Sequence, residues 1–550
     1  MGYQLLWLEC LAFNLLLVAL VTACSARLAR RGWQVAWPAA VAVLFLLNGG
    51  LVVALGFMLR ARHMLFPWLG YFLTMELVSL AGAGLILWRG LRSPAGSAGE
   101  SAPAARGWPR SRLGLAALAA LALSFMTFQD LDAAALAEIS ALRSEAGALA
   151  VFVAPPAVRE ADNAALVYEQ AFEAVPAEDS YPPEWKERLQ DWQKEPEAHL
   201  GEAGFVEYFE RNEPAMKLFR AAAELPACRF DRNFAQPSVN MILPELTKMR
   251  AGARLLAADA RTRISRGDLA GAAGDIGALR SMARHMRSDP ILISLMVSMA
   301  IDGLADGAVE RWLASDGLKS TEQLSTLRPA LAVSLRHDLL RSFRMEEATG
   351  LAAFADLSTG SIGLQVLASG DDHVLRSFNR EAQGAWRVFF LRGELDSYRW
   401  HMNRVQSLVA YPYHESRERW GEFEKAGREP AGILTSLLLP ALTSIAERSA
   451  RSEARTRLAE LGVAVERFRL QHGRHPAKLA ELFAGSAALA ITDPFDGKPL
   501  RMVQADGGVV LYSVGPDGKD DGGREFDNQT RTGDLTFCLG GAYKARREKK

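Results

Sequence analysis

The sequence predicts a mainly α-helical membrane protein that ends in a small α+β domain, and three observations carry this prediction. Long apolar stretches with few charges are crowded into residues 1–128. Between residues 163 and 425 the apolar residues recur at the three- and four-residue steps of a helix. After residue 430, short apolar runs flank a glycine-containing turn. We therefore expect a four-helix transmembrane region over 1–128, a helical domain over 129–429 and an α+β domain over 430–550.

The composition excludes one class of partner. The chain has 550 residues, too many for one ordinary core, so two to four structural units are expected. Lys plus Arg and Asp plus Glu each total 63, which leaves no formal net charge. Because no long basic stripe is present to neutralise phosphates, we expect no nucleic acid partner.

The first 128 residues contain four stretches that fit a lipid bilayer. A helix needs about 20 mostly apolar residues to cross the hydrocarbon core. The stretches with this character cover residues 4–24, 35–59, 65–88 and a shorter one at 113–128. Glu9 and Glu76 lie inside these stretches. Such a carboxylate either has a function or stays protonated and hydrogen-bonded to a neighbouring helix.

Arginine placement predicts how these spans are oriented. Arg and Lys accumulate on the cytoplasmic side of a membrane. The three connections between spans hold Arg27, Arg30 and Arg31, then Arg60 and Arg62, then Arg89, Arg92, Arg106, Arg110 and Arg112. The first and third connections are therefore predicted inside, as the more basic ones, and residues after Phe128 outside. In a bacterium this means a multi-pass inner membrane protein with a large extracytoplasmic part.

The cysteines leave two alternatives open. Val21-Thr22-Ala23-Cys24 resembles a lipoprotein cleavage box, but residues 1–9 lack the basic start of such a signal. We therefore favour an uncleaved first span. Cys228 and Cys538 lie in the predicted extracytoplasmic part, where an oxidising compartment allows them to pair. The alternative is two unpaired thiols in packed surroundings.

The sequence pattern in the middle of the chain predicts packed helices. A helix over 131–147 is expected to continue the fourth span as a stalk, which the prolines at 155 and 156 break. Residues 245–266 and 268–286 predict an antiparallel pair in which Asp268 caps the second helix, similar to a tetratricopeptide-like hairpin. Further helices are expected over 290–314, 321–355 and 374–411.

The last part of the chain predicts a helix laid on a small antiparallel sheet. Residues 458–470 alternate apolar and charged side chains at helical spacing, and Gly473 ends the pattern. Two short apolar runs, 500–503 and 509–514, are separated by Asp506-Gly507-Gly508, which is a hairpin signal.

Several motifs of this part occur in an order that resembles the soluble domain of the major pseudopilin of type II secretion systems. They are Gln471-His472-Gly473-Arg474-His475-Pro476, then Asp493-Pro494-Phe495-Asp496-Gly497-Lys498-Pro499, then Tyr512-Ser513-Val514-Gly515-Pro516-Asp517-Gly518. The whole chain is similar to large membrane-attached proteins of planctomycete-like bacteria with this ending. The resemblance implies a pseudopilin-like fold and envelope or secretion-system proteins as partners.

An acidic, glycine-rich segment follows the hairpin. Calcium takes six to eight oxygen ligands from carboxylates and carbonyls on a flexible chain. Pseudopilins of this type hold calcium in the equivalent loop, so the resemblance implies Asp517, Asp520, Asp521 and Asp527 as ligands. The alternative is that Asp and Gly only make solvated turns.

The pseudopilin-like part differs from the pseudopilin family in its position within the chain. It follows some 430 other residues, and residues 432–445 are too short to span a membrane. We therefore expect a borrowed interaction module in a membrane-anchored envelope or scaffold protein, with this domain as a calcium-stabilised tip. The alternative function is a membrane enzyme or small-solute transporter, although no familiar catalytic motif is present. That alternative predicts a deep pocket lined by titratable groups with shifted pKa values.

Overall fold

The computed structural model describes residues 133–327, 334–361, 391–426, 442–483 and 491–548. The four predicted spans, Glu9, Glu76 and Cys24 lie outside the described residues, so the transmembrane region stays a prediction. The chain divides into two compact units. One comprises Met1–Ala135, Gly384–Glu394 and Arg428–Ser436. The other, here the large unit, comprises Leu136–Gln383, Leu395–Gly427 and Leu437–Lys550.

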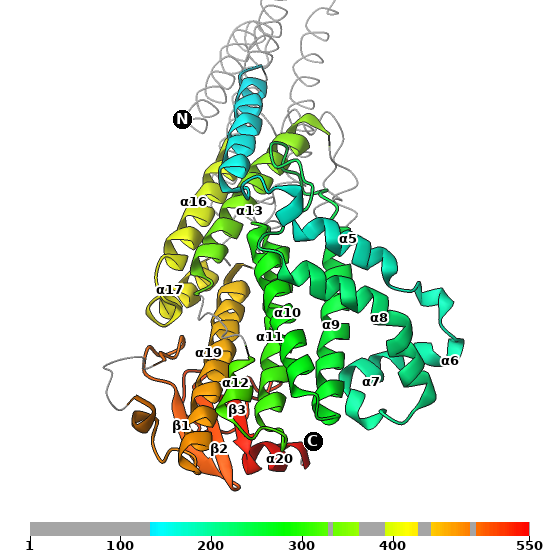
Figure 1. Cartoon of the computed structure of the whole chain (residues 1–550). Helices are drawn as coiled ribbons and strands as arrows, with labels where there is room; N and C mark the ends of the chain where they lie inside the picture. The colour runs from blue at the N-terminus through cyan, green and yellow to red at the C-terminus, as the bar shows by residue number, and fades with distance from the viewer. Residues whose placement is uncertain (1–132, 328–333, 362–390, 427–441, 484–490, 549–550) are drawn as a thin grey trace, which may run out of the picture. The chain divides into compact units, whose positions relative to one another are not determined.

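The described part of the chain is mainly helical (Figure 1). After helical residues 133–153 come α5 (Ala164–Ala174), α6 (Pro183–Lys186), α7 (Leu189–Lys194), α8 (Ala203–Glu224), α9 (Pro244–Ser265), α10 (Leu269–Ser288), α11 (Leu292–Leu313), α12 (Thr321–Ser325), α13 (Arg336–Thr359), α16 (Leu391–Val409) and α17 (Tyr413–Ala426). Short 3-10 turns lie at Glu160–Asp162, Glu178–Ser180 and Pro196–Ala198. The helices predicted over 245–266, 268–286 and 290–314 are thus confirmed, and residues 374–390 of the one predicted over 374–411 lie outside the described residues.

The predicted helix pair is present as α9 and α10, which pack against each other. Gly267 forms the turn with φ +81°, a left-handed conformation that favours glycine. The Asp268 carboxylate accepts the N–H of Gly271 at 2.9 Å and caps α10 as predicted. The two helices follow directly from local sequence signals.

The prediction of one helix over 321–355 was wrong. The structure has two helices instead, α12 and α13, with residues 328–333 between them outside the described residues. The sequence holds Pro329 there, and proline both lacks an N–H and clashes with the preceding turn of a helix. Ser320 and Gln323 form a reciprocal capping box at the start of α12.

Within the described residues, α11 is long and apolar enough to cross a membrane. This helix packs against α9, α10 and α19 in the large unit. It carries the buried carboxylates Asp302 and Asp306, which are paired with arginine. In this structure α11 is therefore the central helix of the packed body.

The C-terminal part has the predicted helix and antiparallel sheet. Helix α19 (Leu442–His472) precedes strands β1 (Arg501–Ala505), β2 (Gly508–Ser513) and β3 (Leu535–Gly540), followed by α20 (Gly541–Glu548). A 3-10 turn covers Leu479–Phe483. The sheet order is β1-β2-β3, with Val503 opposite Val510 and Val510 opposite Cys538. The predicted hairpin is confirmed, because Asp506 and Gly507 both have positive φ at its two-residue turn.

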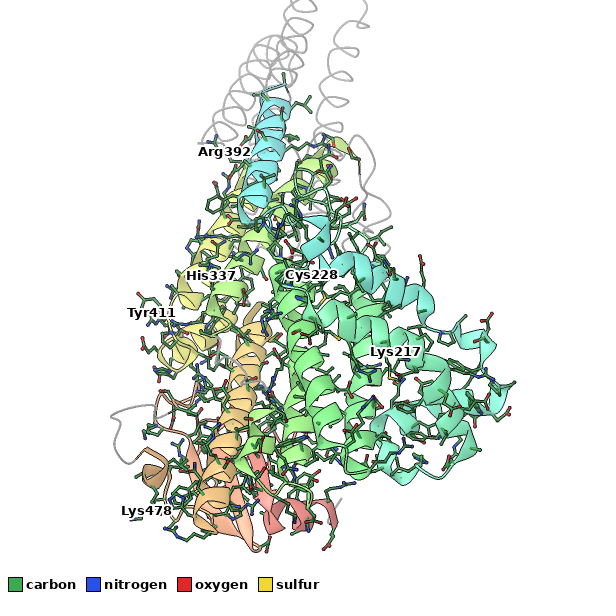
Figure 2. All side chains as sticks on the ribbon, in the orientation of Figure 1. Lys217, Cys228, His337, Arg392, Tyr411 and Lys478 are labelled. Atoms are coloured by element: carbon green, nitrogen blue, oxygen red, sulfur yellow. The ribbon has the colours of Figure 1, made fainter. Side chains whose placement is uncertain are left out.

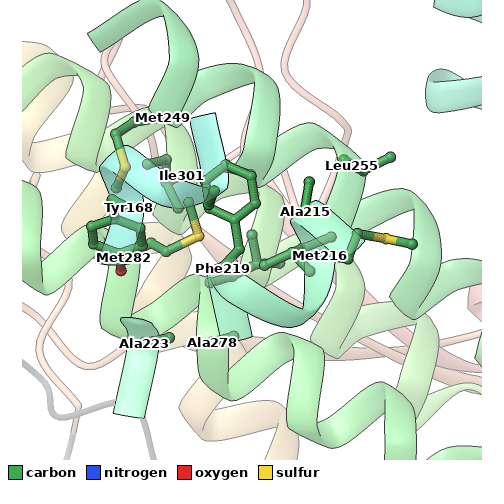
Figure 3. Packing of buried hydrophobic residues seen from close by; sticks show 14 of the residues in the cluster. Tyr168, Ala215, Met216, Phe219, Ala223, Met249, Leu255, Ala278, Met282 and Ile301 are labelled. Carbon is green, nitrogen blue, oxygen red and sulfur yellow. The ribbon is translucent and has the colours of Figure 1, made fainter. Parts of the chain in front are cut away.

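Among the hydrophobic clusters of the large unit, two extend over many of its helices and strands. The first lies between α5, α8, α9 and α10, where Tyr168, Phe219 and Met282 pack with Ile301 of α11 (Figure 3). The second joins Trp312 of α11 to residues of α19 and of all three strands. The helical body and the α+β part therefore share one apolar core, although the sequence predicts them as separate domains.

Candidate functional site

The acidic segment lies between β2 and β3 and turns repeatedly. Glycines 515, 518, 522, 523 and 533 all have positive φ there, which keeps the loop tightly folded. Asp534 is fully buried and holds the loop from inside. Its carboxylate accepts the N–H of Gly523 at 2.7 Å and the N–H of Asp521 at 3.4 Å. Burial raises the pKa of Asp534, and these hydrogen bonds oppose that effect.

Asp517 and Asp520, two of the four predicted calcium ligands, differ from each other in their hydrogen bonds. Asp517 Oδ1 accepts the N–H of Lys519 at 3.1 Å, whereas its buried Oδ2 has no hydrogen-bond partner in the structure. Asp520 is engaged on both oxygens, by the Tyr512 hydroxyl at 3.1 Å and by Nε of Arg501 at 3.0 Å. Of these two, Asp517 is the one with an unused oxygen.

The other two predicted ligands, Asp521 and Asp527, also have their own partners. Asp521 pairs with Arg524 at 3.3 Å. Asp527 accepts the N–H of Gln529 at 2.8 Å and the hydroxyl of Thr530 at 3.1 Å. The N–H of Gln529 is the main cause that lowers the pKa of Asp527. These contacts are those of solvated turns.

The donor set fits calcium only in part. Asp517 Oδ2 is a buried oxygen without a hydrogen-bond donor, which suits a cation. Asp520 and Asp521 would have to release their arginine partners to join it. In the part of the chain that the structure describes, no group of three or more His, Cys, Asp or Glu is placed to hold a metal ion. The calcium site stays a prediction.

A second buried aspartate, which the sequence reasoning missed, fixes the approach to the sheet. Asp493 is fully buried and accepts the N–H of Phe495 at 2.9 Å, the hydroxyl of Ser513 at 2.8 Å and the N–H of Val514 at 2.9 Å. Arg501 joins Asp493 to Asp496 and Asp520. The Asp-Pro motif was a usable signal, since a short polar side chain before a turn commonly binds backbone N–H groups.

Charged side chains also join the α+β part to the helical body. Glu310 of α11 is largely buried; Oε1 accepts the N–H of Cys538 at 2.6 Å and Oε2 pairs with Arg546 at 2.6 Å. Arg547 contacts Glu197 at 3.0 Å. Strand β3 and α20 are therefore bound to the body by polar contacts as well as by the shared core.

The helical body has ion pairs between its own helices. Arg280 of α10 contacts Asp302 at 3.3 Å and Asp306 at 2.5 Å, both on α11. Arg220 of α8 contacts Asp275 of α10 at 2.6 Å. These carboxylates are buried, so each arginine fixes how two helices pack.

Cys228 and Cys538 do not form a disulfide in the structure. Both side chains are buried (Cys228 is labelled in Figure 2). Burial raises the pKa of the Cys228 thiol to about 12, so it is unreactive. Of the two alternatives, the structure has the packed thiols.

A cavity of about 220 Å³ lies between the start of α13, the α16–α17 connection and α19. Two of its titratable groups are shifted: burial raises the pKa of the Glu453 carboxyl, and burial raises that of Tyr413 to about 12. Glu453 Oε1 accepts the N–H of Leu335 at 2.7 Å and Oε2 pairs with Arg457 at 3.0 Å. Because both oxygens are engaged, Glu453 positions helices here and is not a free base.

Comparison of the chain with models of protein families, with curated proteins and with solved structures gives no match. The pseudopilin resemblance therefore depends on the quoted motifs alone and stays a prediction.

Proposed function

We propose that the protein is a membrane-anchored interaction or scaffold protein of the bacterial cell envelope, linked to type II secretion or surface assembly. Its four N-terminal spans anchor it in the inner membrane. Its helical body, with tetratricopeptide-like hairpins, and its pseudopilin-like end lie outside the cytoplasm. Envelope or secretion-system proteins are the partners.

One observation supports this proposal above the others. The α+β part shares its apolar core with the helical body and is joined to it through Glu310. A module held in this way is presented in a defined orientation, as a scaffold requires. The loop between β2 and β3 is the acidic part of this module and holds Asp517, Asp520, Asp521 and Asp527.

Calcium at this loop belongs to the proposal. Asp517 would be the first ligand, because its Oδ2 has no donor, and Asp520, Asp521 and Asp527 would complete the set. The ion would tie the turns of the loop together. Calcium also fits the outside of the cytoplasmic membrane, where it is plentiful.

Thermal unfolding of the full chain in detergent tests the calcium part. We expect the melting temperature to rise with calcium, to fall with chelator and to respond less to magnesium, which demands a stricter geometry. Asp517→Asn removes the response. Asp506→Asn, which removes the same charge from the hairpin turn, keeps it. An unchanged melting temperature, or an equal response in Asp517→Asn, contradicts calcium binding at this loop.

Protease treatment of intact spheroplasts tests the orientation. We expect the chain beyond Phe128 to be cleaved without lysis. If the protease leaves this segment intact in spheroplasts and cleaves it only after lysis, the acidic loop lies in the cytosol. That result contradicts the proposed role. Crosslinking in membranes followed by capture identifies the partners.

A membrane enzyme or small-solute transporter is the second candidate function. The cavity beside Glu453 favours it, because it is lined by two groups with raised pKa values. The full engagement of Glu453 by Leu335 and Arg457 speaks against proton transfer at this position.

A further inference from the structure

The cavity between α13, α17 and α19 has a mostly apolar wall. Ala446 and Ala450 lie four residues apart on one face of α19 and line the cavity. Tyr411, Tyr413 and Trp420 line the same cavity (Tyr411 is labelled in Figure 2). A space lined by aromatic and small side chains suits a flat ring.

The size of the cavity limits what it holds. Its volume is about 220 Å³. A water molecule takes up about 30 Å³ in the liquid, and a cavity of about 150 Å³ holds benzene. A ring with one short substituent therefore fits, whereas a nucleotide or a peptide does not.

The charges around the cavity are not balanced. The charged residues on its wall are Arg336, Glu453 and Arg457, together with His414. Glu453 is paired with Arg457, which also donates to the carbonyl of Thr492 at 2.7 Å. Arg336 also acts electrostatically on Glu453, so one carboxylate faces two arginines and the wall keeps a net positive charge.

Arg336 is exposed and is the first residue of α13. Its Nε donates to the Ser334 hydroxyl at 3.1 Å and its terminal nitrogen to the carbonyl of Ala410 at 3.4 Å. Among the described residues it has no carboxylate partner within ion-pair distance. The start of a helix adds a partial positive charge at the same place. The mouth of the cavity therefore attracts an anion.

We propose that this cavity binds a small organic carboxylate with an apolar ring. The carboxylate contacts the Arg336 guanidinium at the mouth, where two parallel hydrogen bonds are possible. The ring lies against Tyr411 and Trp420, over the alanines of α19. The small net positive charge of the wall, two arginines against one carboxylate, together with its apolar surface favours a monocarboxylate over a phosphate dianion.

Binding of three matched probes to the full chain in detergent tests this site. The probes are phenylacetate, its neutral amide phenylacetamide and inorganic phosphate, followed by ligand-observed NMR with chelator present. The chelator separates this result from the calcium proposal. We expect saturable binding of phenylacetate and about tenfold weaker binding of the amide, the size of one lost charged hydrogen bond. Phosphate is expected not to compete.

Variants locate the binding. Arg336→Gln weakens phenylacetate about tenfold and leaves phenylacetamide unchanged, because it removes only the charged contact. Arg467→Gln removes another exposed arginine, which lies on α19 and does not line the cavity, and changes neither. Ala450→Leu adds three carbon atoms to a lining side chain, reduces the cavity and abolishes binding of both ring probes. If this variant fails to fold, the comparison of wild type with Arg336→Gln still tests the proposal, because the Arg336 side chain is exposed.

Three results overturn the proposal. The first is no saturable binding of either ring probe to the folded protein. The second is equal affinity for phenylacetate and phenylacetamide, which removes the role of charge. The third is competition by phosphate at equal concentration, which indicates a general anion site and not a carboxylate site.

Discussion

The helical body and the acidic loop use carboxylates in opposite ways. In the body, Asp275, Asp302 and Asp306 are buried and face arginines of neighbouring helices. In the loop, Asp520 and Asp527 are exposed and mostly accept N–H or O–H groups from nearby in the sequence. The first arrangement fixes tertiary packing, and the second fixes local turns.

The difference follows from the cost of burying charge. A carboxylate removed from water needs a close cation and further hydrogen bonds, and losing its partner leaves an uncompensated charge. An exposed carboxylate is solvated with or without its partner. Charge changes in the body are therefore expected to alter stability strongly, and changes in the loop weakly.

The largest effect is expected at the contact between the body and β3. Glu310→Ala leaves Arg546 and the N–H of Cys538 without their buried partner. We expect a loss of about 3 kcal/mol in the free energy of unfolding. Denaturant titration measures it. Hydrogen exchange is expected to rise in residues 535–548 and not in α8; a uniform rise argues against a local contact.

A smaller, pH-dependent effect is expected at Asp275. Burial is the main cause that raises the pKa of this carboxyl to about 7, against the pull of Arg220. A raised folded pKa means that the contribution of Asp275 is complete below its unfolded pKa of 3.8 and is lost as the pH rises through about 7.

Asp275→Asn removes this titration. We expect the stability difference between wild type and variant to change by on the order of 2 kcal/mol between pH 4 and 8, in favour of the variant at high pH. Denaturant titrations at several pH values measure it. A difference that is constant with pH contradicts the raised pKa.

The smallest effect is expected in the loop. Asp527→Ala removes contacts to Gln529 and Thr530 in an exposed turn. In chelator we expect a change of no more than about 0.5 kcal/mol in the free energy of unfolding. If Asp527→Ala lowers the free energy of unfolding as much as Glu310→Ala does, the expected difference between the acidic loop and the helical body is wrong.

Local sequence signals were enough for several elements. The α9–α10 turn followed from Gly267 and Asp268, and the hairpin from Asp506 and Gly507. The interruption between α12 and α13 was missed although Pro329 is present, because the apolar spacing continues across it. Periodicity alone does not show a break of this kind.

The sites were less predictable from the sequence. The predicted ligands Asp517, Asp520, Asp521 and Asp527 all lie in one loop, but the structure gives them separate partners. Asp534 has the central position in that loop, and its burial was not visible in the sequence. The cavity beside Arg336 was missed because its residues come from segments far apart in the chain.

The sequence by itself determined the elements of this protein: its helices, its hairpin, its apolar N-terminal stretches and its acidic turns, since each depends on neighbours a few residues away. Only the tertiary structure decided that the α+β part shares a core with the helical body. Glu310 and Cys538 are 228 residues apart. No local pattern brings such residues together, because their contact depends on how whole helices and strands pack.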